Sequence, residues 1–389
     1  MVDTADIVIV GGGAVGASIA YHLGQRGVGR GVVLLERNTL GSGSTGRSAG
    51  GIRCQFSTEI NIRFSLEALE VWRQFESIFG LPVDYREIGY LFLAHTEQQA
   101  EQFRHNVALQ NRLGVPSRLV DAPEMARLVP GLNTADLTAG AYSPRDAIAG
   151  PNEATQAFVR RAREAGVRIC EGVEVTAIDT RHDRVQAVET THGRIETPVV
   201  VNAAGPWAAL VGRMAGLDVP VKPYRRELFV SEPFEAIPEV PLVIDIGVGW
   251  YFRREGPGIL MSGAKDNHSS FDMHVDWGGL PRIAAHATQR MPPLAAARFG
   301  SKAWAGLYDV SPDDHAILGP VPELPGFYCA NGFSGHGFQH SPTTGRVMAE
   351  WILDGHVTGQ DVTPLTITRF QTGALLREPL TAHAGTFAG

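Results

Sequence analysis

The sequence predicts an α/β protein, α+β overall, in which a discontinuous nucleotide-binding domain is interrupted by a mainly antiparallel β-sheet domain. Three observations predict this fold. A glycine-rich turn joins an apolar strand to a helix near the start of the chain, later glycine clusters resemble further parts of the same domain, and alternating apolar runs lie between them. The chain has 389 residues, which at a typical domain size of about 150 residues indicates two or three domains.

Composition excludes several classes of protein. The chain has 34 Lys and Arg against 41 Asp and Glu, a net charge of −7, and the basic residues form no block, which argues against a nucleic-acid or anionic-membrane partner. We therefore expect a small-molecule partner. Cys54, Cys170 and Cys329 are too few and too scattered for a disulfide framework or a thiolate metal site. We expect a cytoplasmic protein without a resident metal.

The N-terminal region contains a charge-free run, residues 7–21, that could be mistaken for the core of a signal peptide. Asp3 and Asp6 stand where a signal peptide has basic residues, and three consecutive glycines interrupt the run. No other stretch approaches the roughly 20 apolar residues of a membrane span. We therefore expect neither a signal peptide nor a transmembrane helix.

The first forty residues carry the pattern of a Rossmann-like dinucleotide-binding unit. A β-branched strand, residues 7–10, leads into the glycines of residues 11–16, then a helix over 14–25 and a second apolar strand, 32–35, that ends in an acidic residue. In this pattern the glycines permit the turn, the approach of a diphosphate and the packing of the helix, while the acid accepts hydrogen bonds from a ribose and disfavours NADP. Both FAD and NAD satisfy it. The candidate residues here are Gly11, Gly13, Ala14, Val15, Gly16, Glu36 and Arg37.

A second glycine-rich stretch, residues 41–51, follows the second strand. It could be a flexible linker, but it precedes an amphipathic helix whose apolar residues Ile60, Phe64, Trp72, Phe75 and Phe79 keep helical spacing. A loop of small residues and hydroxyls inside a core would let an extended ligand pass close to the backbone, which favours FAD over NAD. The candidate residues are Ser44, Thr45, Arg47, Ser48, Ala49, Gly50 and Gly51.

Together these blocks resemble the FAD-binding half of the D-amino acid oxidase and sarcosine oxidase family, most closely the sarcosine oxidase β-subunits and proline dehydrogenases. The resemblance returns at residues 199–207, 311–313 and 332–338. It implies an FAD cofactor with further contacts at Val175, Ala203, Ala204, Gly205, Trp207 and Gly306. The resemblance implies that the backbone near Val175 contacts the adenine of FAD.

The same blocks predict the domain organisation. Residues 1–80, 146–217 and 301–389 are expected to form the FAD-binding domain, with a helix over 153–165 and a strand-rich segment over 167–201. Residues 81–145 and 218–300, which contain alternating runs at 89–94 and 250–254, are expected to form the antiparallel substrate domain. In the family this sheet roofs the flavin.

A third glycine cluster lies between an apolar strand, residues 327–330, and a helix expected from about 343 to 353. The helix N-terminus would stabilise negative charge on a reduced flavin, although a plain strand-to-helix turn is the alternative. His336 and His340 are four residues apart but precede the expected helix, so we expect no metal pair. The candidate residues are Gly332, Ser334, Gly335, His336, Gly337, Phe338 and Gln339.

The resemblance also implies the chemistry, in which a substrate C–H leaves as hydride to flavin N5 and gives an imine. Arg53 stands where the family carries a carboxylate-binding arginine, although a surface arginine is the alternative. Gln339 replaces a lysine that makes a second carboxylate contact, so Arg253 or Arg254 is expected to take that role. Tyr251 and Phe252 alternate with these arginines and are candidate walls of the amine site, although a packed sheet face is the alternative. The candidate catalytic residues are Arg53, Tyr251, Arg253, His336 and Gln339.

Three departures from the family concern the flavin. The cysteine and the histidine that bind FAD covalently in some members fall at Gly306 and near Arg47, so we expect non-covalent FAD. The lysine that promotes reaction with oxygen aligns loosely with Met261, four residues before Lys265. We therefore expect an electron acceptor other than oxygen.

The function that the sequence favours is oxidation of the C–N bond of a small secondary amino acid, such as sarcosine, an N-methyl amino acid or proline. One alternative is a D-amino acid or glycine oxidase. Another is a non-catalytic flavoprotein that serves as an assembly factor or as a subunit of an electron-transfer complex, and a third is an NAD-dependent dehydrogenase. Heteromeric and homo-oligomeric assembly both stay open.

Overall fold

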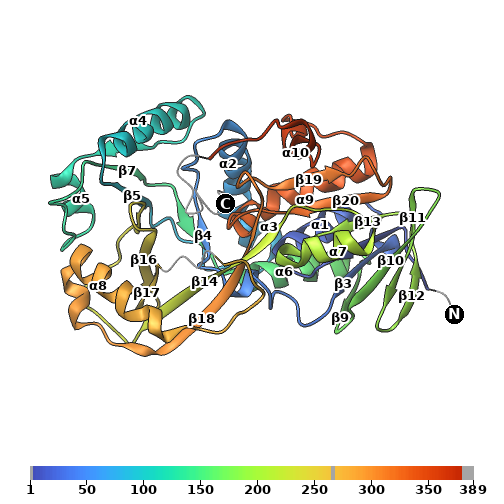
Figure 1. Cartoon of the computed structure of the whole chain (residues 1–389), viewed down its shortest axis with the longest axis horizontal. Coiled ribbons are helices and arrows are strands. Elements are labelled where there is room, and N and C mark those ends of the chain that lie inside the picture. The colour runs from blue at the N-terminus through green and yellow to red at the C-terminus, as the bar shows by residue number, and fades with distance from the viewer. Residues whose placement is uncertain (1–2, 264–267, 379–389) are drawn as a thin grey trace.

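The computed structural model describes residues 3–263 and 268–378 and consists of two lobes built on separate sheets (Figure 1). One lobe holds a six-stranded sheet in the order β19, β20, β13, β2, β3, β9. Its strands are parallel except for β19, which pairs antiparallel with β20. Their bounds are β2 (Ile7–Val10), β3 (Val32–Glu36), β9 (Arg168–Glu171), β13 (Val200–Asn202), β19 (Ile317–Pro320) and β20 (Phe327–Asn331).

The six-stranded sheet is buried on both faces, which explains why its central strand β2 is apolar throughout and its neighbours are largely apolar. Ile7 and Ile9 of β2 pack on one face against the helices, whereas Val8 and Val10 pack on the other face. The first face is covered by α1 (Ala14–Gln25), α2 (Glu59–Arg73), α6 (Pro151–Glu164) and α9 (Gly337–Asp354). The other is covered by α7 (Ala208–Met214) and by a four-stranded sheet of β1 (Asp3–Thr4), β10 (Val175–Arg181), β11 (Arg184–Thr190) and β12 (Gly193–Glu196).

The second lobe is an eight-stranded sheet in the order β18, β14, β17, β16, β15, β5, β7, β6. Its strands pair antiparallel except for β15 with β5, as expected for a mainly antiparallel domain. Their bounds are β5 (Tyr90–Ala94), β6 (Arg118–Val120), β7 (Ala139–Ser143), β14 (Lys222–Ser231), β15 (Leu242–Asp245), β16 (Trp250–Glu255), β17 (Gly258–Ser262) and β18 (Phe299–Val310). A short pair, β4 (Gly51–Ile52) with β8 (Ala147–Ile148), lies between the lobes.

The second lobe also contains helices that the alternating runs did not indicate. These are α4 (Glu97–Arg112), which packs with Tyr90 and Phe92 on one face of the sheet, and α5 (Ala122–Leu128) and α8 (Leu280–Arg290), which pack with Leu91 and Leu93 on the other face (Figure 1). Thr96 begins α4 with a capping box, in which its side chain accepts from the Gln99 backbone and the Gln99 side chain accepts in return. The Thr96 and Gln99 spacing is a helix-start signal in the sequence, next to the strand-like run of residues 89–94.

Two element boundaries differ from the sequence prediction. The expected helix over residues 60–79 is two helices, α2 and α3 (Phe75–Phe79), which are separated at Gln74. The predicted domain boundary at 300/301 falls inside β18, which pairs with β14 from Phe299 to Val310 and so belongs to the eight-stranded sheet. The division into domains otherwise stays a prediction.

Short 3-10 helices and a C-terminal arm complete the described chain. The 3-10 helices are η1 (Gly29–Gly31), η2 (Thr45–Arg47), η3 (Gly205–Trp207), η4 (Trp277–Gly279), η5 (Pro292–Ala296) and η6 (Thr363–Leu365). After η6 the arm forms α10 (Arg369–Thr372) and continues to Glu378 beside α2. In the part of the chain that the structure describes, none of the helices has the length and apolarity that crossing a membrane requires.

Candidate active site

A cavity of about 590 Å³ lies between the two lobes and is lined from both of them. The first lobe contributes the ends of β2 and β3, the start of α1, the loop after β3 and the turns before α7 and α9. The sheet of the second lobe contributes β14, β16 and β18 and so forms one wall. The lining residues that the sequence had singled out are Gly11, Gly13, Ala14, Val15, Glu36, Arg37, Ser44, Thr45, Arg47, Ser48, Ala49, Val175, Ala203, Ala204, Gly205, Trp207, Tyr251, Gly306, Gly335, Gly337 and Phe338.

The first glycine turn leaves no room for side chains. Gly11 has a φ of +113°, and a β-carbon there would lie 2.4 Å from the carbonyl oxygen of Ala203. A β-carbon on Gly16 would lie 2.0 Å from the carbonyl oxygen of Gly11. Gly16 therefore lets α1 pack against the turn and does not itself line the cavity, whereas Gly13 exposes backbone at the cavity where the helix begins.

Glu36 is the last residue of β3, the position where the dinucleotide pattern places an acidic residue. Its Oε2 accepts from the Gly12 backbone N–H at 2.8 Å and its Oε1 from that of Asn38 at 2.9 Å. Nearby, the Arg37 guanidinium lies 4.2 Å from the centre of the Trp207 ring, and Trp207 stacks on Phe271 with 5.8 Å between ring centres. This end of the cavity thus has an acid, a cation and an aromatic face.

The Gly/Ser-rich loop is tied to both lobes and is not a free linker. The Thr45 hydroxyl accepts from the Ala14 backbone N–H at 3.1 Å, which fixes the loop to the start of α1. Towards β18, the Ser44 hydroxyl donates to the Leu307 carbonyl at 2.5 Å and Arg47 donates to the Ala305 carbonyl at 3.0 Å. Trp304 donates back to the Arg47 carbonyl at 2.9 Å. Gly50 and Gly51 continue past the cavity into β4.

The third glycine cluster forms the turn before α9, and the predicted start of that helix at about 343 was wrong. The helix begins at Gly337 with His336 as its N-cap and continues through Pro342. Proline in a helix interior removes one backbone hydrogen bond and so resembles a boundary, but Pro342 lies inside α9. Gly335 has a φ of +95° and lies against the Tyr308 ring, whereas Gly332 and Ser334 lie behind the cavity wall, where Gly332 packs on Ile317 and Ser311.

The earlier helix start brings the two histidines onto one element, so the reason given for dismissing a metal pair was wrong. His340 Nε2 instead lies 2.8 Å from the Ser65 hydroxyl and 3.2 Å from Gln339 Nε2, and burial lowers the pKa of His340 to about 3. His336 lies against Arg53. Among the described residues, no group of three or more His, Cys, Asp or Glu side chains could hold a metal ion.

Arg53 is largely buried beside the cavity and does not lie on the surface. Its Nη2 lies 3.2 Å from His336 Nε2, its Nη1 donates to the Gln55 carbonyl, and its guanidinium lies 3.8 Å from the centre of the Phe56 ring. Burial lowers the pKa of Arg53, although neighbouring acidic groups oppose that shift. The guanidinium is thus an ordered cation close to the Tyr308 wall.

Gln339 holds Arg53 through its backbone and does not face the cavity as a second substrate contact. Its Oε1 accepts from the Arg53 N–H at 3.1 Å and its Nε2 donates to the Arg53 carbonyl at 3.2 Å. The predicted contact failed because residue 339 is already inside α9, on the side that packs against α2, where Trp72 donates to the Gln339 carbonyl at 2.9 Å.

The two arginines of β16 are engaged elsewhere. Arg253 donates twice to the Ala49 carbonyl, at 2.7 and 3.0 Å, and pairs with Glu255 at 2.5 Å. Arg254 donates to the carbonyl oxygens of Phe234 and Ile237 on the other side of the strand. Phe252 is fully buried in the core of the sheet, so of the alternating pair only Tyr251 reaches the cavity.

The sequence interpretation missed four functional candidates on the sheet wall and its edge: Arg226, Met273, Tyr308 and Asp309. Arg226 lies 5.4 Å from the centre of the Tyr308 ring. Burial raises the pKa of Tyr308, while Arg226 and then Arg53 act against that rise. Tyr308 thus lies within the electrostatic reach of two guanidinium groups. Its place two residues after Gly306 was the available signal, because both lie on β18 and alternate strand residues share a face.

Asp309 is a buried carboxyl at the cavity. Burial raises its pKa to about 6, against the opposing effect of the Phe333 backbone N–H, which donates to Oδ2 at 3.1 Å. Its neighbours along β18 and in the turn before α9 are backbone groups and aromatic rings. The end of the cavity towards α9 therefore combines the Arg226 guanidinium, the phenols of Tyr251 and Tyr308 and a titratable acid, with Arg53 close to Tyr308.

The geometry defines a dinucleotide-binding oxidoreductase. A long groove runs from the Glu36 end past the start of α1 and the hydroxyl-rich loop to the turn before α9, and β-carbons on Gly11 and Gly335 would collide with the Ala203 backbone and the Tyr308 ring. These residues fit FAD, with the diphosphate at residues 11–15 and the ribose at Glu36.

The family is established by comparison. Residues 6–351 match the family model described as FAD dependent oxidoreductase. The chain therefore belongs to this family of FAD-dependent oxidoreductases, its cofactor is FAD, and the resemblance read from the sequence is confirmed.

Three similar proteins bear on the reaction. The chain is 32% identical to mitochondrial sarcosine dehydrogenase of Mus musculus over 94% of this chain but 41% of that protein, so it spans about two fifths of that relative's length. It is 31% identical to "FAD-dependent oxidoreductase domain-containing protein 1" of Bos taurus over 97% of this chain and 87% of that protein. The crystal structure of L-proline dehydrogenase from P. horikoshii matches with a TM-score of 0.91 and 32% identity, covering 97% of this chain and all of that one.

Proposed function

We propose that the protein oxidises the C–N bond of a small secondary amino acid to an imine. One observation carries the proposal: Arg226 lines the FAD cavity 5.4 Å from the centre of the Tyr308 ring, and Arg53 is close enough to oppose the rise in the pKa of Tyr308, which provides two cations for a substrate carboxylate in a chain of net negative charge. FAD bound in the groove would supply the hydride acceptor.

The residues of this chain would bind and orient the substrate. Arginine is the best bidentate donor for a carboxylate, and Arg53 is held in place by Gln339 and by the Phe56 ring. Burial raises the pKa of Tyr251 above its ordinary value, as it does for Tyr308. Both phenols therefore stay neutral at physiological pH and can hydrogen-bond to the substrate or exclude water without losing a proton.

The names of the similar proteins support a secondary amine. One is a sarcosine dehydrogenase and another an L-proline dehydrogenase, and both names specify an amino acid whose nitrogen carries two carbons. The choice of substrate within this class is part of the proposal, as is the assignment of the activity to this chain alone.

Anaerobic titration of the purified protein with sarcosine, L-proline, N-methyl-L-alanine, glycine and D-alanine tests the proposal. We expect a secondary amino acid to bleach the visible flavin band and the primary amino acids to leave it unchanged at equal concentration. Bleaching by glycine or D-alanine alone would instead favour a primary amino acid oxidase, and bleaching by none of them a non-catalytic flavoprotein.

Two properties of the flavin belong to the same proposal. We propose that FAD is held non-covalently, since Gly306 and Arg47 occupy the tethering positions, and that the electrons pass to an acceptor other than oxygen. Met261, the position aligned with the oxygen-activating lysine, is fully buried in the core of the sheet, and Lys265 lies outside the described residues. Yellow colour that stays on the denatured chain, or rapid reoxidation of the reduced flavin by air, would contradict these two points.

Location in the cytoplasm and assembly with a partner are further parts of the proposal. The absence of basic clusters supports a small-molecule partner and no nucleic acid. Size-exclusion chromatography with light scattering, on protein purified from its native source, would establish whether the chain is isolated, self-associated or bound to other subunits.

A further inference from the structure

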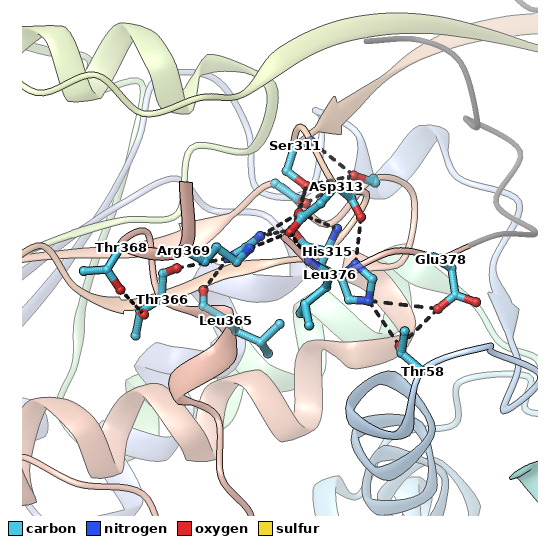
Figure 2. Close-up of polar contacts among 12 residues, drawn as sticks. Thr58, Ser311, Asp313, His315, Leu365, Thr366, Thr368, Arg369, Leu376 and Glu378 are labelled. Carbon is cyan, nitrogen blue, oxygen red and sulfur yellow. Dashed lines mark hydrogen bonds and ion pairs between the residues drawn. The ribbon is translucent and has the colours of Figure 1, made fainter. Parts of the chain in front are cut away.

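The C-terminal arm, residues 363–378, brings a buried carboxylate to the segment that carries Arg53. After η6 and α10 the arm returns to the start of α2, where the Glu378 side chain lies beside Thr58 (Figure 2). Glu378 is only 6% exposed. Buried carboxylates are retained where hydrogen bonds or opposite charges hold them, so the partners of Glu378 indicate what it does.

Three groups around the start of α2 donate to the Glu378 carboxylate. The Ser57 backbone N–H donates to Oε1, and the Thr58 hydroxyl and the Asn61 side chain donate to Oε2 at 3.1 and 3.3 Å. Thr58 is the N-cap of α2, but its side chain makes no capping bond to the helix. A carboxylate at this end is also stabilised by the helix dipole. The arm thus provides, through Glu378, the side-chain hydrogen bonds at the start of α2 that its own N-cap residue does not make.

The arm itself is docked firmly enough to place Glu378. The Arg369 guanidinium donates to both oxygens of Asp313, at 2.7 and 2.9 Å, and Asp313 also accepts from the Leu376 backbone at 3.1 Å. His315 completes the connection seen in Figure 2, because its Nδ1 donates to the Asp313 carbonyl at 2.7 Å and its Nε2 lies 3.1 Å from the Thr58 hydroxyl.

Residues 55–58, which Glu378 holds at the start of α2, also contact the Arg53 side chain. Arg53 precedes Thr58 by five residues, its Nη1 donates to the Gln55 carbonyl, and its guanidinium lies over Phe56 of the same segment. Burial lowers the pKa of Arg53, and among the charges that oppose this effect Glu378 is the largest, ahead of Tyr90 and Asp146. Glu378 is therefore coupled to Arg53 both through the backbone and through charge.

We propose that Glu378 is a positioning residue for Arg53: its carboxylate fixes the segment of residues 53–58 so that the guanidinium stays oriented for a substrate carboxylate. The proposal rests on the proposed function, in which Arg53 binds that carboxylate. Glu378 acts through Arg53 and does not touch the substrate.

The first test measures binding of pyrrole-2-carboxylate, a flat analogue of proline, to the FAD-loaded full chain through the change in the flavin spectrum. We expect Glu378→Ala to weaken binding about tenfold, with the FAD content unchanged. Glu378→Gln, which keeps the side-chain length and one acceptor oxygen, should stay within about threefold of the wild type. Glu235→Ala, at an exposed carboxylate in the second lobe, is the matched control and should have no effect. With a substrate, the loss should fall on KM and not on kcat.

The second test asks whether the effect passes through Arg53. In an Arg53→Gln background, Glu378→Ala should cause no further loss of pyrrole-2-carboxylate affinity. An equal loss in both backgrounds, or a Glu378→Ala protein that binds the analogue like the wild type, overturns the inference while leaving the proposed function standing. A wild-type protein whose flavin spectrum responds to no carboxylate overturns both. If Glu378→Ala does not retain FAD, a Thr58→Val protein with wild-type FAD content, which loses the hydroxyl that donates to Glu378, carries the same cycle.

Discussion

At the scale of single residues, Arg53 differs from most arginines because nearly every neighbour constrains it. Gln339 holds its backbone on both sides, and His336 and Phe56 contact its guanidinium. An arginine that is ordered before the ligand arrives loses less side-chain entropy on binding. The ordered geometry of Arg53 and its charge therefore contribute separately to substrate binding, and a substitution that keeps only the charge can distinguish them.

We expect Arg53→Lys to raise KM for the amino acid substrate by about ten- to a hundredfold with FAD affinity unchanged, because lysine keeps the charge but loses the planar fork. Steady-state kinetics and flavin fluorescence titration would measure the two quantities. Arg63→Lys, on the exposed side of α2, serves as the control. A KM that does not change in Arg53→Lys would mean that this guanidinium does not bind the substrate carboxylate.

Asp309 makes stability depend on pH. Its pKa in the folded protein, about 6, lies above the ordinary 3.8 because the carboxyl is buried. Between these values the folded chain keeps a proton that the unfolded chain has released, so the free energy of unfolding falls as pH rises through this window. Relative to Asp309→Asn, the wild type should lose on the order of 1–3 kcal/mol over that window.

Urea unfolding of the FAD-free wild type and Asp309→Asn at several pH values between 4 and 7 checks this expectation. The comparison isolates Asp309, because Asp146, whose pKa burial also raises to about 6, is present in both proteins. Parallel pH profiles for the two proteins would show that Asp309 has an ordinary pKa.

At the scale of elements, the glycine turn after β2 is the feature on which the groove depends. A β-carbon on Gly16 would have to displace either the Gly11 carbonyl or the whole of α1. We expect Gly16→Ala to lower the FAD content of the purified protein and its melting temperature, because overpacking against backbone costs about 1–3 kcal/mol. Gly279→Ala is the control, since a β-carbon there meets atoms no closer than 3.8 Å. Equal FAD content in both variants would contradict the assignment of this turn.

The C-terminal arm depends on one buried ion pair. Both side chains of Arg369 and Asp313 are at most 2% exposed. Burial alone would raise the pKa of Asp313, but the Arg369 guanidinium outweighs burial and the pKa is lowered. We expect Arg369→Leu to destabilise the fold by about 3–5 kcal/mol, because it leaves a carboxylate buried without its partner.

The double variant Arg369→Leu with Asp313→Leu should recover much of that loss, since neither charge is then left alone. Chemical denaturation of the wild type, both single variants and the double variant would give the coupling energy. Additive losses in the double variant would mean that the pair contributes no coupling.

Sequence patterns predicted the local features of this fold well, where a few adjacent residues determine the backbone. The turn at residues 11–16 and the strands around it were predictable because glycine and β-branched residues act locally. The start of α9 was not, since Pro342 resembles a helix boundary although its missing N–H is tolerated in this helix. The roles of Gln339 and Arg253 were also not predictable from the sequence, because the packing of α9 and β16 determines which of their side chains face the cavity.

At the scale of the whole molecule, the cavity exists only where the two lobes meet. Glycines and hydroxyls of the first lobe would hold the FAD, while Arg226, Tyr251 and Tyr308 come from the sheet of the second. The loop of residues 41–51 is bonded to β18 by Ser44, Arg47 and Trp304, so the cofactor groove and the substrate wall are mechanically connected. The proposed amino acid oxidation therefore requires both lobes, and it is best tested on the intact chain.

The most direct measurement is the rate of anaerobic flavin reduction in stopped flow with a secondary amino acid and with its uncharged carboxamide. We expect the amino acid to reduce the flavin at least tenfold faster at subsaturating concentration, because only its carboxylate can pair with the cations at the cavity. Equal rates for the two compounds, or no reduction by any secondary amino acid, would contradict the assignment of this protein as a secondary amino acid oxidoreductase.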